Sequence, residues 1–338
     1  MHAAGSLKMG SSGANWVFLV LAVSLVVSAS ATSDDDELMI GGLNITYSCK
    51  KSNGSTVLDK ELIEVALNLE YLEAEYFLWG SVGYGLDVEA KYLVDGGPPP
   101  IGVQKANLNP YYKDIFYQFG LQEVGHIRAI KALLDYRPHC AFPRTLLDLS
   151  KKNWAHTMDE AFLATFGHKL NPPFDPYRNS LNYLISTYTI PYVGLTGYVG
   201  SNPLLTGYNS KRLVAGLLAV ESGQDAVIRT EMYRMKDKIV PPYKYTVANF
   251  SNAISNLRNN LSHALVDEGL VVPKYLGAEM KVTGNILAGD NNSVAYARTA
   301  QQVLETVYGT GNASKPGGFF PKGAQGVIAA SYLDPDDY

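Results

Sequence analysis

Four long stretches of the chain repeat apolar residues at steps of three and four positions, the spacing of one face of an α-helix. They cover roughly residues 58–79, 110–136, 177–199 and 211–235. Pro138 ends the second stretch. Pro191 predicts a kink inside the third, because its ring removes one backbone donor and crowds the preceding turn. The pattern predicts an all-α protein built on four long helices.

Shorter helical patterns complete the predicted domain. They lie near Leu146, over 154–166, near 245–266 and near 293–308, and a tail rich in glycine and proline from Lys315 is typical of coil. No internal repeat and no obvious linker interrupts the chain. We therefore predict an N-terminal arm (32–56), one helical domain (57–310) and a C-terminal coil tail (311–338).

Residues 1–31 have the pattern of a secretory signal peptide. An apolar run, WVFLVLAVSLVV (16–27), follows Lys8 and precedes the small residues 29–31. At this length the run is too short for a membrane span. The pattern predicts a secreted, extracellular protein that has no membrane segment once the signal is cleaved.

Six N-x-S/T sequons agree with secretion, because such sites accept N-glycans in secreted proteins. They are Asn44, Asn53, Asn249, Asn260, Asn291 and Asn312. Cys49 and Cys140, the two cysteines of the chain, could form a disulfide in an oxidising compartment or stay as unpaired thiols.

The charge balance narrows the class of partner. The formal net charge is -4 and no basic run is present, so the chain lacks the electrostatic signature of a nucleic-acid-binding protein. Small molecules or metal ions are the expected partners. The sequence does not predict the oligomeric state.

Polar pairs interrupt the apolar faces of three of the long helices. These pairs, each three positions apart, are Glu70 with Glu73, Glu123 with His126, and Glu221 with Gln224. Residues at this spacing share one helix face. Buried carboxylates are unfavourable unless a metal ion, a cationic side chain or bound protons compensate their charge. No lysine or arginine lies on the four predicted inner faces, which favours a metal ion or protons.

Several stretches, in order, resemble a known family. They are LNLEYLEAEYFLWGSVGYGLD, QEVGHIRAI, LLDLS, PPFDPY, IPYVGLTGYVGSNPLL and LLAVESGQDAVIR. From Leu58 to the tail the chain is similar to the plant desiccation-related proteins of the ferritin-like superfamily. The resemblance implies a ferritin-like four-helix bundle with additional C-terminal helices, in a protein of the apoplast or cell wall that responds to water stress. It implies the fold more than any reaction.

The resemblance also suggests a set of metal ligands. It places the ligand of the first helix at Glu70, the Glu-x-x-His pair of the second at Glu123 and His126, and the pair of the fourth at Glu221 and Gln224. The glutamate of the third helix falls at or beside Pro191, where the chain has no carboxylate.

Two of the six ligand positions are therefore altered. Glu70, Glu123, His126 and Glu221 suffice for one iron, manganese or zinc ion, whereas a stable pair of irons is less expected. Glu73 could replace a missing ligand, and Gln224 is a further possible ligand. Tyr188, one turn before Pro191, could point its phenol into the same space.

Three functions remain open at this point. The first is a metal-binding or weakly redox-active stress protein. The second is a metal-independent isomerase or cyclase of a small metabolite, with His126 as base, Glu123 orienting it, and Glu70 or Glu221 as acid. Tyr188 would be a further candidate catalytic residue. The third is a non-catalytic protective protein whose polar cluster only fixes the helix register.

Overall fold

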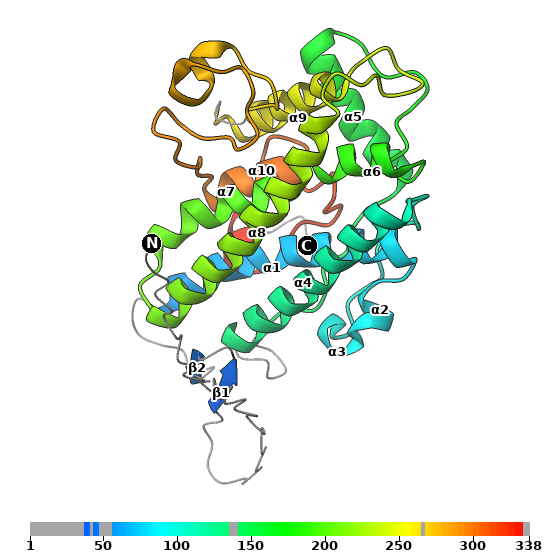
Figure 1. Cartoon of the computed structure of the whole chain (residues 1–338). Helices are drawn as coiled ribbons and strands as arrows, with labels where there is room; N and C mark the ends of the chain where they lie inside the picture. The colour runs from blue at the N-terminus through cyan, green and yellow to red at the C-terminus, as the bar shows by residue number, and fades with distance from the viewer. Residues whose placement is uncertain (1–36, 41–42, 47–55, 135–140, 265–267, 334–338) are drawn as a thin grey trace, which may run out of the picture. The chain divides into compact units, whose positions relative to one another are not determined.

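A bundle of long helices forms the centre of the computed structural model, which describes residues 37–40, 43–46, 56–134, 141–264 and 268–333 (Figure 1). The predicted all-α fold is confirmed. The bundle consists of α1 (Thr56–Val82), α4 (Pro110–Leu134), α8 (Tyr208–Arg234) and, in the third position, α6 (Ser180–Thr187) followed by α7 (Pro191–Ser201).

The closest helix pair of the bundle is α1 with α4. Leu78 of α1 faces Gly120 of α4, and about two turns earlier on α1 Glu70 faces His126, so the two helices run antiparallel. A Cβ at Gly120 would lie 2.8 Å from Leu78 Cδ2 and 3.1 Å from its backbone nitrogen. The missing side chain therefore lets the two backbones approach, which brings Glu70 within hydrogen-bonding distance of His126.

The third position of the bundle is divided between two helices. The sequence predicted one kinked helix over 177–199, whereas α6 ends at Thr187 and α7 begins at Pro191. Pro191 is the first residue of α7. A backbone N–H at this position has no acceptor within the helix, so the proline costs the helix no hydrogen bond. The proline therefore starts a new helix instead of bending an existing one.

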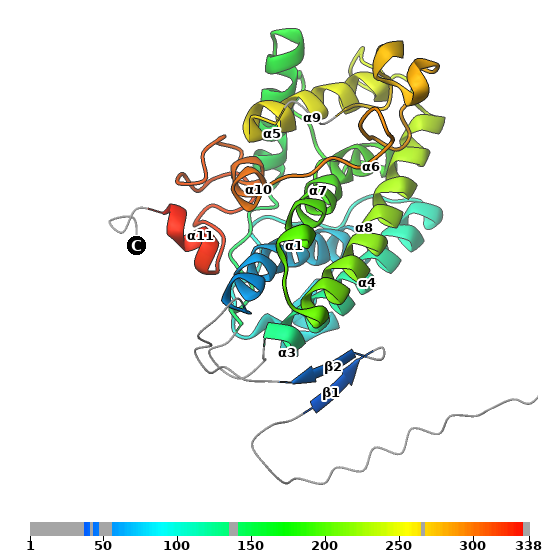
Figure 2. The same cartoon turned by 90° about the vertical axis from the view of Figure 1, so that its left-hand side faces the viewer.

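A second group of helices packs beside the bundle (Figure 2). The helix α5 (Lys151–Phe166) pairs with α9 (Val247–Ser262), and α10 (Ala300–Val307) contacts α9 and α7. Ser150, Thr246 and Thr299 cap these three helices by accepting a hydrogen bond from a backbone N–H of the first turn. The predicted helices at 154–166, 245–266 and 293–308 correspond to α5, α9 and α10, the last of which is shorter than predicted.

Several short elements complete the described residues. They are α2 (Leu86–Glu89), α3 (Lys91–Val94), α11 (Val327–Tyr332), the 3₁₀ turns η1 (Asn202–Leu204), η2 (Lys274–Leu276) and η3 (Ala278–Met280), and the antiparallel strands β1 (Glu37–Ile40) and β2 (Leu43–Thr46). Two sequence predictions are wrong here. Leu146 is not helical, and the tail, predicted as coil, contains α11.

The helix α1 is buried on every face between residues 67 and 78. The C-terminal segment covers one side, where Asn68 donates to the Gln325 carbonyl and accepts from the Gln325 N–H. On another side Glu75 forms a buried ion pair with Arg144. Local periodicity predicted only one apolar stripe on α1, because residues distant in sequence supply the rest of its cover.

Some predictions concern residues that the structure does not describe. The signal peptide (1–31), Cys49, Cys140 and Asn53 lie outside the described residues. Asn260 and Asn291 are exposed, whereas Asn249 accepts a hydrogen bond from Thr246 in the capping box of α9. None of the helices in the described part of the chain is both long enough and apolar enough to span a bilayer.

Asp59 connects the beginning of α1 to the beginning of α8. Its buried carboxylate accepts hydrogen bonds from the backbone N–H groups of Thr206 and Gly207, at 2.8 Å each. Burial alone would raise the pKa of Asp59, but these hydrogen bonds outweigh it and hold the pKa below its ordinary value of 3.8.

Replacing Asp59 by alanine is expected to lower the free energy of unfolding by about 2 kcal/mol at pH 7. Because folding lowers the pKa, this stabilisation is present above the unfolded-state pKa and is lost as the pH falls through the folded-state value. Urea denaturation at decreasing pH measures the difference. Asp237→Ala, at an exposed position, should change stability by less than about 0.5 kcal/mol. If the difference in free energy of unfolding between the wild type and Asp59→Ala did not change with pH, the ionised carboxylate would not be the stabilising group.

Candidate metal centre

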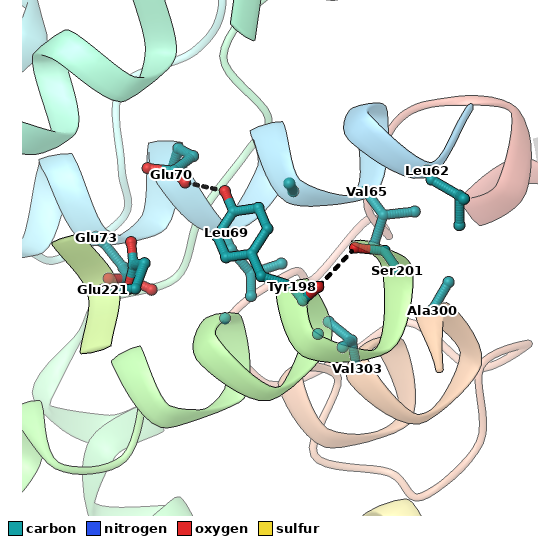
Figure 3. A pocket seen from close by; sticks show the side chains of 13 residues that line it. Leu62, Val65, Leu69, Glu70, Glu73, Tyr198, Ser201, Glu221, Ala300 and Val303 are labelled. Carbon is teal, nitrogen blue, oxygen red and sulfur yellow. Dashed lines mark hydrogen bonds between the residues drawn. The ribbon is translucent and has the colours of Figure 1, made fainter. Parts of the chain in front are cut away.

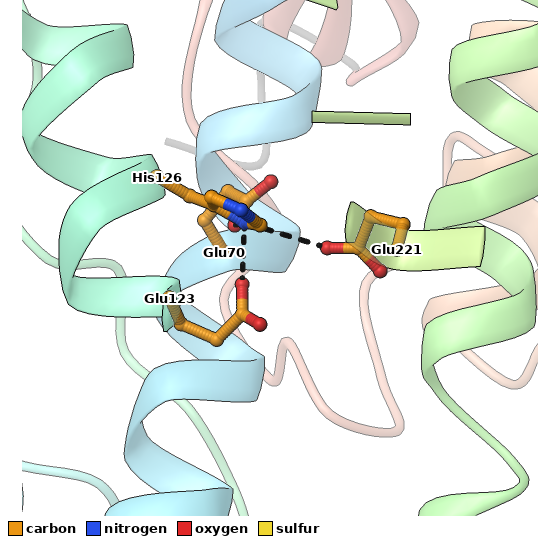
Figure 4. Close-up of side chains that lie close together, drawn as sticks. All are labelled: Glu70, Glu123, His126 and Glu221. Atoms are coloured by element: carbon orange, nitrogen blue, oxygen red, sulfur yellow. Dashed lines mark hydrogen bonds and ion pairs between the residues drawn. The ribbon is translucent and has the colours of Figure 1, made fainter. Parts of the chain in front are cut away.

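Glu70, Glu123, His126 and Glu221 meet in the middle of the bundle (Figure 4). The structure thus brings together the four ligands that the sequence suggested for one ion, from α1, α4 and α8. One ligand atom of each residue lies within 4.8 Å of the others, and all four side chains are buried. Ligand bonds to zinc-sized ions measure about 2.0–2.2 Å, so small side-chain movements would place all four atoms around one ion.

The imidazole of His126 directs one nitrogen at three carboxylates. Its Nδ1 atom lies 2.9 Å from Glu123 Oε2, 3.0 Å from Glu70 Oε2 and 3.6 Å from Glu221 Oε1. A single N–H on Nδ1 cannot donate a good hydrogen bond to all three carboxylates. A cation held between them would use the same oxygen atoms and the nitrogen lone pair.

Burial and mutual repulsion shift the pKa values of the cluster. Burial raises the pKa of Glu123 well above its ordinary range, and it raises the pKa of Glu221 to about 7. Burial alone would lower the pKa of His126, but the carboxylates of Glu123 and Glu70 outweigh it and raise that pKa. The His126 cation in turn outweighs the burial of Glu70 and lowers the pKa of that carboxyl. Without a metal ion, the cluster must therefore hold protons.

Two side chains hold the carboxylates of this cluster in place. The Tyr198 hydroxyl of α7 donates a hydrogen bond to Glu70 Oε1. The amide of Gln224 donates to Glu123 Oε1 and, at 3.0 Å, to Gln122 Oε1. Gln224, at the histidine position of the fourth helix, thus supports a glutamate in this structure, while its Oε1 atom has no hydrogen-bond partner among the described residues.

Tyr188 does not share this space, contrary to the sequence prediction. Its hydroxyl lies 3.1 Å from Ser255 Oγ and accepts a hydrogen bond from Arg229 at 3.0 Å. The guanidinium of Arg258 lies over the Tyr188 ring. The tyrosine that contacts the cluster is Tyr198 of α7, through Glu70. Tyr188 and Tyr198 both lie in the helix predicted over 177–199, and spacing alone could not show which tyrosine reaches the carboxylates.

The fold agrees with the family whose domain the chain matches. Residues 58–234 match the model of the ferritin-like domain. The chain belongs to the ferritin-like family. It is 50% identical over 283 residues to the ferritin-like catalase Nec2 of Nesocodon mauritianus, covering 83% of this chain and 88% of the relative. It is 52% identical over 269 residues to the desiccation-related protein PCC13-62 of Craterostigma plantagineum, covering 79% and 83%. No solved structure gives a significant match.

The resemblance to desiccation-related proteins is therefore confirmed. The structure also shows which residue of the third helix lies next to the carboxylates. In ferritin-like metal sites each of the four helices supplies a carboxylate. Besides Tyr198, Gly194 of α7 also faces the cluster, three positions beyond Pro191: a Cβ built there would lie 3.4 Å from Glu73 Oε1 and 3.8 Å from Glu221 Oε2. At this position α7 therefore presents no side chain to Glu73 and Glu221.

A small cavity of about 30 Å³ lies beside the cluster (Figure 3). Glu70, Glu73, Glu221 and Tyr198 form its polar end, and apolar side chains such as Leu62 line the rest. A water molecule needs roughly 10–15 Å³ measured in this way, so the cavity holds one or two molecules of that size.

Tyr198→Phe is expected to destabilise the protein by about 1–3 kcal/mol, because it leaves the buried Glu70 oxygen without its donor. Chemical denaturation of the metal-free protein measures this change. Tyr208→Phe removes the same hydroxyl from a side chain that is 74% exposed and serves as the matched control. Equal stabilities of the two variants would show that the hydroxyl does not support Glu70.

Proposed function

We propose that this ferritin-like protein holds a redox-active metal ion between Glu70, Glu123, His126 and Glu221 and decomposes hydrogen peroxide. The observation that carries the proposal is the convergence of these four ligand atoms within 4.8 Å in a buried site. The printed name of the relative from Nesocodon mauritianus, a ferritin-like catalase, supports the reaction.

The proposed redox reaction requires iron or manganese. Carboxylate and imidazole ligands suit both metals, and both change oxidation state, whereas zinc does not. When bound, such an ion supplies the electron transfer of the reaction. One peroxide molecule takes up two electrons and two protons to give two water molecules, and a second peroxide releases two electrons and two protons to give dioxygen.

The protein residues have separate tasks in this proposal. The three carboxylates and the imidazole bind the ion, and Tyr198 keeps Glu70 oriented toward it through the hydroxyl hydrogen bond. The cavity next to Glu70 and Tyr198 admits a molecule of about the size of hydrogen peroxide. Its apolar lining limits the access of bulk water.

The size of the cavity also separates the proposal from the second function suggested by the sequence. A metabolite that undergoes isomerisation or cyclisation needs several hundred Å³, the usual size of a small-molecule pocket. The cavity at the cluster measures about 30 Å³. Peroxide decomposition therefore fits this site better than acid–base chemistry on an organic substrate.

We place the reaction outside the cell, in the apoplast or cell wall. This part of the proposal rests on the signal-peptide pattern of residues 1–31 and on the sequons. The name of the relative from Craterostigma plantagineum associates that protein with desiccation, which supports a role in water stress.

His126→Ala is expected to reduce the bound metal to less than about a tenth of an ion per chain and to abolish oxygen release from peroxide. Metal analysis of protein from a secretory host, and an oxygen electrode with added hydrogen peroxide, measure the two effects. His156→Ala is the control, since the side chain of His156 is 62% exposed and lies on α5. Wild-type protein without metal, or metal-loaded protein that releases no oxygen, would refute the proposed function.

A further inference from the structure

We propose that a second cavity, at the break between α6 and α7, binds a small organic carboxylate with an apolar body. This cavity has a volume of about 230 Å³. Pockets for drug-sized ligands usually measure about 300–1,000 Å³, so this one suits a smaller molecule. It shares no lining residue with the cavity beside the metal cluster. The inference therefore stands apart from the proposed peroxide activity.

The walls of this cavity come from parts of the chain that lie outside a simple four-helix bundle. They are α5, α9 and α10, the beginning of α7 with the break before it, and residues 308–310 and 317–319, which follow α10 (Figure 2). The apolar part of the lining consists of Ile190, Val193, Leu257, Leu261, Val307 and Phe319. The break before Pro191 and the additional helices thus enclose a space with mainly apolar walls.

One buried hydroxyl group in the wall has no hydrogen-bond partner. Thr189, in the break between α6 and α7, is 7% exposed, and its Oγ1 atom forms no hydrogen bond with the part of the chain that the structure describes. Buried hydroxyl groups are normally paired, because an unpaired one costs free energy. An oxygen atom of a ligand in the cavity would accept a hydrogen bond from Thr189 and remove this cost.

A buried guanidinium lies next to this hydroxyl. Arg258 of α9 is 1% exposed and lines the same cavity. Its Nη1 atom donates hydrogen bonds to the carbonyl groups of Tyr188, at 2.5 Å, and of Thr189, at 3.5 Å. The guanidinium also lies 4.7 Å from the centre of the Tyr188 ring and 5.0 Å from that of Tyr192. These contacts fix the position of the cation, which favours a negative group of the ligand beside Thr189.

The negative charge in the lining lies at the solvent-exposed side of the cavity. Glu160 of α5 supplies the one carboxylate among the described lining residues. Its side chain is 42% exposed and lies 3.8 Å from His156. Water and salt screen exposed charges, whereas they screen the buried Arg258 much less. A hydroxyl donor and a buried cation at the end of an apolar cavity therefore match a carboxylate that carries an aromatic or aliphatic body.

Benzoate is the probe for this site, and isothermal titration calorimetry of the full chain measures its binding. We expect benzoate to bind at least about tenfold more tightly than benzyl alcohol, which has the same ring and no charge. Thr189→Val keeps a similar shape without the hydroxyl and should weaken benzoate binding about tenfold. Thr230→Val, the same change at an exposed position of α8, is the control and should leave benzoate binding unchanged.

A second variant tests the location of the site. Leu261→Trp adds bulk to the cavity from a partly buried position of α9 and should abolish benzoate binding. Thr189→Val is expected to fold like the wild type, because it removes a hydroxyl without a partner. Circular dichroism and urea denaturation compare the folding of the variants with that of the wild type.

Three results would overturn the inference. The first is a wild type that does not bind benzoate at about 10 mM. The second is a wild type that binds benzyl alcohol as tightly as benzoate, since the cation would then select no negative group. The third is benzoate binding to folded Thr189→Val or Leu261→Trp that is as tight as binding to the wild type.

Discussion

The burial of four carboxylates around one imidazole is the constraint on which the structure depends. Glu70, Glu73, Glu123 and Glu221 are each at most 2% exposed, and ionised carboxylates in such surroundings are strongly unfavourable unless cations or protons compensate them. The raised pKa values of Glu73 and Glu123, caused mainly by burial, express this cost. The bundle therefore encloses a buried carboxylate and histidine cluster whose charge must be compensated by cations or protons.

The rest of the fold keeps this site buried and aligned. The helix α1 carries two of the carboxylates and is enclosed on all sides, partly by the C-terminal segment through Asn68 and partly by the Arg144–Glu75 ion pair. Asp59 fixes the beginning of α8 to that of α1. Glu221 of α8 and Glu70 of α1 then lie at the same level along the bundle, where both approach His126. These segments therefore contribute to the site indirectly, by excluding water from the helix that carries Glu70 and Glu73.

The third position of the bundle differs most from a regular ferritin-like site. Pro191 starts a new helix, Gly194 presents no side chain to the cluster, and Tyr198 contributes a phenol instead of a carboxylate. The Glu73 carboxylate and a cavity of about 30 Å³ lie beside Gly194. Gly194 of α7 and Glu73 of α1 thus line the same small volume beside the cluster.

The sequence by itself determined the long helices and the polar pairs on their inner faces, because helical periodicity and the i, i+3 spacing are local properties. The resemblance of its motifs implied the family and the set of four residues that converge. Only the tertiary structure decided that Tyr198 and not Tyr188 contacts Glu70, that Gly194 faces Glu73, and that the third long helix is two helices. These features depend on the rotation and approach of helices distant in sequence. The spacing of residues along one helix contains no information about what packs against it.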